Sequence, residues 1–242
     1  MRVKRRIPIA RGIPDPIDPQ ESGTMAVHLA GIFTLERTAR ESREDHIVIM
    51  GMLADYIREK AAWIGDRTTQ PPITPFPIDL QTVLTVICRR KREYERGKDL
   101  NVSLVRTDLR GAYLVSGHLE EVIFSDAHLE GAQLSSARLE RAVFTRAHLE
   151  GAWLRYANLQ GAVFENAHLE GAHLNFADLT GTHFLGTHLE GADLRGAKGL
   201  TLEQLQRVFY DETTQLPEEI VEQLTPEESE TKETGSTHAK SI

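Results

Sequence analysis

A large apolar residue occurs at every fifth position from Leu104 to Leu194, without a break. Neither the 3.6-residue period of an α-helix nor the two-residue period of a strand divides five, so either element would spread these side chains over all its faces. The chain must therefore turn at regular intervals. The nineteen positions are the predicted structural core: Leu104, Leu109, Leu114, Leu119, Phe124, Leu129, Leu134, Leu139, Phe144, Leu149, Leu154, Leu159, Phe164, Leu169, Leu174, Leu179, Phe184, Leu189 and Leu194.

The sequence also repeats with a second, longer period of twenty residues. The phenylalanines stand at 124, 144, 164 and 184, and the hexapeptide Ala/Thr-His-Leu-Glu-Gly-Ala begins at 127, 147, 167 and 187. Four five-residue units therefore make one coil, and like residues stack on one another. The pattern predicts a four-sided solenoid of about 4.75 coils over residues 99–200. We expect the glycines two positions after many core residues to let the backbone turn each corner.

Several units resemble the consensus of the pentapeptide-repeat family, which is a small residue, a polar residue, Leu or Phe, a polar residue and Gly. Thr107–Gly111, Ala157–Gly161 and Ala177–Gly181 are close matches. The resemblance implies a right-handed quadrilateral β-helix and little about function. Upstream, Gly31–Arg37 with Asp45-His46 resembles the helical segment before the repeats in some bacterial members of the family.

Before the repeats the apolar spacing becomes helical, which predicts a helical domain over residues 24–98. The pattern favours a helix of about 17 residues from Thr24, a second through Ile47–Ala61 and a third over Asp79–Tyr94. We expect the run Arg89–Arg92 to cap the C-terminal dipole of the third helix. That helix should also cover the first coil, because an uncovered solenoid end exposes strand edges and core to water.

The two ends of the chain differ from the middle. Residues 1–23 are basic and rich in proline, which predicts a flexible arm, and residues 225–242 are acidic and predict a disordered tail. Thr201–Gln204 has the pattern of a capping box that starts a helix to about Phe209, and Pro217–Leu224 predicts a second short helix. Residues 201–224 should cap the last coil. The expected fold class is therefore mainly β, with an α-helical N-terminal part and a C-terminal capping helix.

Composition and charge argue against several classes of function. The 242 residues have a net charge of -8, which disfavours direct binding of nucleic acid. The single cysteine, Cys88, cannot form an internal disulfide, and no apolar run reaches the roughly 20 residues of a membrane-spanning helix. We therefore expect a cytoplasmic protein. The sequence also lacks phosphate-binding loops, nucleophile elbows and sheltered carboxylate pairs, so we predict no enzyme, no catalytic residue and no cofactor.

Four histidines form the most regular polar pattern. His128, His148, His168 and His188 recur every twenty residues, each followed two positions later by a glutamate. Such columns can bind zinc or respond to pH. The preferred interpretation is that histidine and glutamate fill solvent-facing repeat positions and encode no closed ligand cage. We therefore predict no metal site.

Exposed aromatic residues are the better functional signal. Tyr113, Trp153, Tyr156 and Phe176 fall at outward or corner positions of one face and are the candidate partner-binding residues. The alternatives are that the N-terminal helices fold back onto this face, or that corner positions simply tolerate bulk. A second apolar stripe contains Ile123, Val143 and Val163, and the sequence leaves open a homodimer through either one.

Two classes of function fit this pattern. The first is a non-catalytic scaffold that presents rigid faces to an unidentified protein partner. The second is a DNA-mimicking inhibitor or protector of a type II topoisomerase, an activity that the family resemblance implies for some members. Residues 102–200 contain twelve acidic and eight basic residues, which is mixed rather than strongly acidic. The scaffold is therefore preferred.

Overall fold

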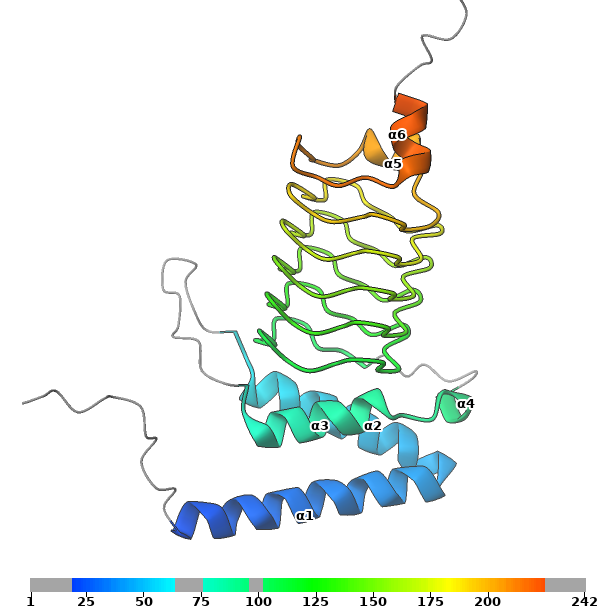
Figure 1. The fold of residues 1–242 in the computed structure, drawn as a ribbon. Helices are drawn as coiled ribbons and strands as arrows, with labels where there is room; N and C mark the ends of the chain where they lie inside the picture. Colours follow the sequence, from blue (N-terminus) through cyan, green and yellow to red (C-terminus); the bar gives the residue numbers. More distant parts are fainter. Residues whose placement is uncertain (1–18, 64–75, 96–101, 225–242) are drawn as a thin grey trace, which may run out of the picture.

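The fold is an end-to-end arrangement of a small helical part and a β-helical rod (Figure 1). A computed structural model describes residues 19–63, 76–95 and 102–224. The helices of the N-terminal part are α1 (Pro19–Glu41), α2 (Arg43–Lys60), α3 (Ile78–Cys88) and α4 (Arg92–Glu95). The rod is followed by α5 (Leu202–Leu205) and α6 (Glu218–Leu224). Helix α1 begins five residues before the expected Thr24. The rest of the predicted arm, 1–18, and the predicted tail, 225–242, lie outside the described residues.

Each coil of the rod pairs with the next through single-residue parallel bridges rather than extended strands. The bridges join residues twenty apart, as in His128 to His148 and Trp153 to His173. The Leu129 amide, for example, donates to the His148 carbonyl at 2.6 Å, and the His148 amide donates to the Ala127 carbonyl at 2.9 Å. The twenty-residue period of the sequence is thus the hydrogen-bonding period of the rod.

The interior of the rod is a continuous apolar column. All nineteen predicted core side chains are at most 3% exposed. The four phenylalanine rings stack with centroids 5.0, 4.7 and 5.6 Å apart from Phe124 to Phe184. The alanines two positions before the core residues are buried as well, because the narrow coil leaves no room there for a larger side chain.

Every corner of the rod has a left-handed backbone. All nineteen positions from 106 to 196 that follow a core residue by two have φ between 54° and 69°, and ten of them are not glycine. The expectation that glycine turns the corners is therefore too narrow. Hydrogen bonds between coils hold this conformation also at Arg141, Tyr156 and Phe176, although a left-handed backbone costs an L-residue roughly 1–2 kcal/mol.

The helical part covers the first coil of the rod. Helices α2 and α3 lie directly beneath that coil, and α1 packs on their far side (Figure 1). The backbone after α2 pairs with the rod through an antiparallel bridge between Ala62 and Thr107. The Arg58 guanidinium donates to the Ser103 carbonyl at 3.0 Å, and the His118 amide donates to the carbonyl of Cys88, the last residue of α3, at 2.9 Å. Two helices, not one, cover this end.

The third predicted helix is shorter than expected. Instead of continuing over Asp79–Tyr94, α3 ends at Cys88 and a separate turn, α4, follows. The break lets Arg90 turn inward, where it is 3% exposed and donates to the Glu120 carbonyl. The prediction that Arg89–Arg92 caps the helix dipole is therefore wrong for Arg90, which joins the helical part to the rod.

The C-terminal segment combines a short helix with further pairing. The predicted capping box is present, because the Thr201 hydroxyl accepts from the Gln204 amide and the Gln204 side chain accepts from the Thr201 amide. Helix α5 ends at Leu205, however, and not near Phe209. Phe209 pairs with His188 and Gln215 with Asp193, so the chain returns to the last coil. Within the described residues, no helix is both long and apolar enough to cross a membrane.

Candidate functional site

The four repeat histidines form a ladder of stacked rings along one face of the rod. Neighbouring ring centroids from His128 through His148 and His168 to His188 are 4.5, 4.8 and 4.9 Å apart, and the rings are parallel within 9°. The rod forces this geometry, because bridges between coils align the histidines at the strand spacing. We call these residues and their glutamate partners the histidine ladder.

Aromatic rings from outside the repeats cover both ends of the ladder. Trp63, after α2, stacks on His128 with centroids 3.6 Å apart, and Phe209 stacks on His188 at 4.6 Å. The Arg110 guanidinium lies 4.8 Å from the Trp63 ring, on which it makes a cation–π contact. Neither Trp63 nor Phe209 has a position in the repeat, so the periodicity gives no signal that either residue contacts the histidines.

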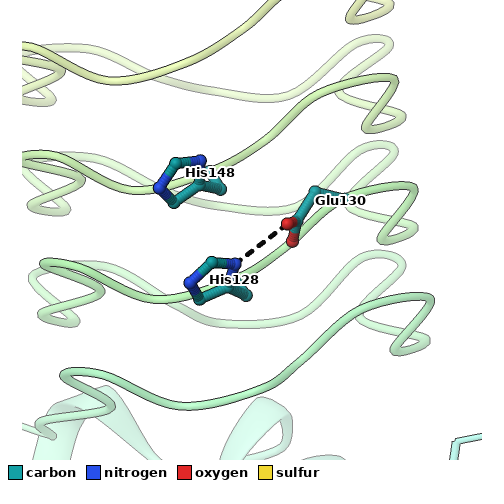
Figure 2. A group of neighbouring side chains, drawn as sticks. All are labelled: His128, Glu130 and His148. Carbon is teal, nitrogen blue, oxygen red and sulfur yellow. Dashed lines mark hydrogen bonds and ion pairs between the residues drawn. The ribbon is translucent and has the colours of Figure 1, made fainter. Parts of the chain in front are cut away.

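Each histidine is hydrogen-bonded to the glutamate two residues later. The Nδ1 to Oε1 distances are 2.9, 3.1, 3.0 and 3.2 Å for His128–Glu130, His148–Glu150, His168–Glu170 and His188–Glu190. Figure 2 shows the first pair, with His148 on the next coil above it. A carboxylate only accepts, so Nδ1 carries the proton in every pair.

The ladder is less exposed than a solvent-facing column. The side chains of His128, His148, His168 and His188 are 8%, 11%, 25% and 33% exposed, so burial decreases away from the helical part. The expectation that these positions face solvent is wrong for the first two. Burial tends to raise the pKa of the Glu150 carboxyl, but the hydrogen bond from His148 and the charge of the neighbouring histidines outweigh it and lower that pKa.

The second buried polar cluster joins the helices to the rod and has no signal in the repeat pattern. Arg90, Glu95 and His46 have side chains at most 2% exposed, and Glu120 is 7% exposed. The His46 ring contacts Glu95 Oε1 at 3.1 Å through Nε2 and the Ala39 carbonyl at 3.0 Å through Nδ1. The charges of the cluster therefore compensate one another at the boundary between the two parts.

We call His46, Arg90, Glu95 and Glu120 the junction cluster. Burial and neighbouring charges shift the pKa values of its members in opposite directions. Burial lowers the pKa of Arg90, and the charges of Glu95 and Glu120 only partly compensate. Burial alone would raise the pKa of Glu95, but hydrogen bonds from His46 and Arg92 and the charge of Arg90 bring it below its ordinary value. Nearby, burial raises the pKa of the Cys88 thiol to about 12, which keeps this thiol protonated and unreactive.

The four predicted partner-binding residues are all exposed, but they do not form one group. Tyr113, Trp153, Tyr156 and Phe176 are 58%, 42%, 57% and 49% exposed. Tyr113 lies two coils from Trp153, with Gln133 between them in the same row, and its backbone exchanges two hydrogen bonds with the Gln81 side chain of α3. The helices thus meet only the edge of this face and leave the rest uncovered.

The other three residues gather on neighbouring coils with a histidine. The Trp153 ring lies 4.2 Å from the His173 ring, and the Tyr156 ring lies 5.2 Å from the Phe176 ring. We call Trp153, His173, Tyr156 and Phe176 the aromatic patch. The second predicted stripe is less exposed, since Ile123, Val143 and Val163 are half-buried.

Phe176 has space because of a glycine on the next coil. A Cβ at Gly196 would lie 2.5 Å from the Phe176 ring, so the ring occupies the space that a side chain at 196 would need. Tyr156 and Phe176 both occupy left-handed corners, with φ of 58° and 59°. The patch is thus built against the backbone preference of large side chains.

Comparison with known proteins identifies the repeats. The sequence profile described as "Pentapeptide repeats (8 copies)" matches residues 103–141, 123–161 and 157–196. A search of curated proteins finds no significant match.

Among solved structures, the chain is similar to HetL, a pentapeptide repeat protein involved in heterocyst differentiation regulation from the cyanobacterium Nostoc sp. strain PCC 7120. The identity is 37% over 39% of this chain and 42% of HetL, with a TM-score of 0.34, so the match spans less than half of HetL. Rfr23 from the cyanobacterium Cyanothece 51142 is 30% identical over 51% of this chain and 68% of its own, with a TM-score of 0.31.

QnrB1, a plasmid-mediated fluoroquinolone resistance protein, is 18% identical over 49% of this chain and 79% of its own, with a TM-score of 0.24. The profile match falls on the residues whose five-residue core and twenty-residue bridges are described above. The chain therefore belongs to the pentapeptide-repeat family, and its repeats form a right-handed β-helix.

Proposed function

We propose that this protein is a non-catalytic scaffold that binds a protein partner through the aromatic patch. The observation that carries the proposal is the position of Tyr156 and Phe176. Both are large, exposed aromatic side chains at left-handed corners, whereas the other eight non-glycine corners carry polar residues and the remaining nine carry glycine. A large side chain that costs backbone energy without burial in the protein itself points to an external contact.

The backbone cost of these two corners also supports an external contact. A left-handed conformation costs an L-residue roughly 1–2 kcal/mol, and Tyr156 and Phe176 recover little of it because about half of each residue remains exposed. A whole aromatic side chain buries roughly 150–250 Å², and a partner that covers Tyr156 or Phe176 removes about half of that area from water, which is enough to offset the cost at about 25 cal/mol per Å². Aromatic side chains also dominate the binding energy of most protein interfaces.

The frame that holds the patch is rigid. We infer a quadrilateral rod of about 4.75 coils, covered by α2 and α3 at one end and by residues 201–224 at the other. Bridges and stacked cores fix each coil to the next, so the patch residues keep their spacing when a partner binds. A cytoplasmic location is part of the proposal. Cys88 is the single cysteine and cannot form an internal disulfide, so the fold does not require an oxidising compartment.

The alternative, DNA mimicry toward a type II topoisomerase, has less support. A DNA mimic needs rows of carboxylates that imitate phosphates, whereas the glutamates of the histidine ladder are hydrogen-bonded to histidines. On other faces Asp126 pairs with Arg146 and Glu120 with Arg138. A DNA supercoiling assay with purified gyrase separates the two functions, and we expect no inhibition and no protection from quinolones.

The scaffold is tested by comparing the wild type with the double variant Y156S/F176S. Serine already occupies the two preceding corners of the same column, Ser116 and Ser136, so the substitution suits the backbone. The matched control is L185S, which removes a side chain that is 55% exposed and lies outside the patch. Each protein is immobilised, and native-cell proteins that bind are quantified by mass spectrometry.

We expect at least one protein that binds the wild type and L185S equally and loses most of its binding to Y156S/F176S. The same protein should then bind in purified form with the same ranking. Equal retention of every bound protein by all three baits would contradict the role of the aromatic patch.

A further inference from the structure

We propose that the histidine ladder binds a divalent transition-metal ion of the Zn²⁺ class, with His128, Glu130 and His148 as the first site. These three residues each offer one ligand atom, and the atoms lie within 4.8 Å of one another. Figure 2 shows the Glu130 carboxylate beside the two stacked rings. The site is separate from the aromatic patch and does not depend on the scaffold function.

The donor set determines the class of ion. Imidazole nitrogen with carboxylate oxygen suits Zn²⁺, Ni²⁺ and Cu²⁺, whereas Mg²⁺ and Ca²⁺ prefer oxygen alone. The ladder repeats this set, because His148, Glu150 and His168 form a second group with ligand atoms within the same limit. A third group consists of Glu170, His188 and Glu190.

A second observation concerns the carboxylates. In Glu130, Glu150, Glu170 and Glu190 the oxygen Oε1 accepts from histidine, while Oε2 is buried and has no hydrogen-bond partner among the described residues. A buried carboxylate oxygen without a partner is costly. A cation bound to the carboxylate would compensate the charge that Oε2 shares with Oε1, without disturbing the fold of the coil.

Of the three groups, the first should bind the ion most tightly. Its histidine side chains are the most buried of the ladder, at 8% and 11% exposed, so an ion there competes with less water. Trp63 covers the His128 ring from the side of the helices. The ion would take the position of the proton between Nδ1 and Oε1, and the displaced proton would move to Nε2 of the same ring or, from an imidazolium, to water.

Binding requires a small movement, which limits the affinity. Two nitrogens bound to one tetrahedral Zn²⁺ at about 2.1 Å lie about 3.4 Å apart, so ligand atoms separated by up to 4.8 Å must approach one another. Parallel rings must also tilt toward each other, because a metal binds close to the plane of an imidazole. We therefore expect micromolar binding rather than the tighter binding of a closed cage, and a disturbed stack between His128 and Trp63.

The test is isothermal titration of the full-length protein with ZnCl₂. We compare the wild type with H148Q, which removes a nitrogen shared by two groups, and with E130Q, which removes the carboxylate charge of the first group. H183Q is the matched control, since His183 is an exposed repeat histidine outside the ladder. Circular dichroism melts establish that each variant is folded.

We expect saturable binding to the wild type and H183Q, and a loss of affinity of at least about tenfold in H148Q and E130Q. As a second readout, Ni²⁺ should quench the fluorescence of Trp63 in a W153F background, and H148Q should abolish the saturable part. Absence of saturable binding by the wild type, or equal binding by H148Q, E130Q and H183Q, would overturn the proposal.

Discussion

The indole ring of Trp63 lies on the imidazole ring of His128, with centroids 3.6 Å apart and an angle of 18° between the planes. One ring comes from the segment after α2 and the other from the rod. This contact therefore joins the two parts of the molecule at the same place where the backbone of Ala62 pairs with Thr107. The helical part is attached to the rod through stacked rings as well as through hydrogen bonds.

The stack on Trp63 predicts different effects for the two tryptophans. Trp63→Ala should lower the free energy of unfolding by about 2 kcal/mol, because it removes a half-buried side chain and its ring contact with His128. Trp153→Ala should change it by less than about 1 kcal/mol, since Trp153 is 42% exposed. Urea denaturation followed by circular dichroism measures both. Equal effects would show that Trp63 does not fasten the helices to the rod.

The narrow interior predicts a steep ranking of core substitutions. Leu149→Asp places a carboxylate among side chains that are not exposed, and it should unfold the repeat region. Phe144→Leu keeps an apolar group in the phenylalanine stack and should cost about 1–3 kcal/mol. Arg155→Asp, at an exposed position, is the control and should be nearly neutral. A native far-ultraviolet spectrum for Leu149→Asp would contradict the buried column.

Two glycines separate backbone strain from crowding. Gly151 and Gly199 both have positive φ, at 63° and 75°, but an added Cβ meets nothing at Gly151 and lies 2.7 Å from the Thr180 backbone at Gly199. Gly151→Ala should cost about 1 kcal/mol from backbone conformation alone. Gly199→Ala should cost clearly more, because its neighbour is backbone and must shift. Thermal melts compare the two, and equal losses would mean that crowding adds nothing.

The junction cluster predicts a large effect for Arg90. Arg90→Met removes a buried guanidinium that lies near Glu95 and Glu120, and it leaves these carboxylates without that charge. We expect a loss of about 3–5 kcal/mol. Arg207→Ala breaks the exposed ion pair with Glu203 and should cost at most about 1 kcal/mol. A small effect in Arg90→Met, measured by urea denaturation, would show that the cluster does not hold the parts together.

Acid should weaken the last coil through Asp193. Hydrogen bonds from Arg195 lower the pKa of the Asp193 carboxyl from 3.8 to about 2, with smaller contributions from the Arg195 amide and Asn175. Because the pKa is lower in the folded state, the carboxylate stabilises the fold above pH 4, and this contribution is lost as the pH falls from about 4 to about 2.

The matched variant is Asp193→Asn, which should be less stable than the wild type at pH 7. The difference between the two should shrink as the pH falls through the same range. Melting temperatures at a series of pH values measure it, and a difference that is independent of pH would contradict the assignment to Asp193.

The repeats show how far a sequence alone can determine a structure. Their five-residue and twenty-residue periods predict both the buried column and the pairing of coils, because each unit contacts its copies at a fixed spacing. The same periods place His128 and His148 one above the other and leave Tyr156 and Phe176 at corners. The capping box at Thr201 is also local, so the sequence predicts its start correctly.

Contacts between distant segments were decided only by the tertiary structure. Arg90 turns inward because Glu120 of the rod and Glu95 of α4 meet it there, and no local pattern shows that meeting. The same is true of Trp63 and Phe209, which have no repeat position and yet close the two ends of the histidine ladder. Periodicity reports what repeats along the chain, whereas the burial of a single arginine or histidine depends on which non-repeating segment packs against it.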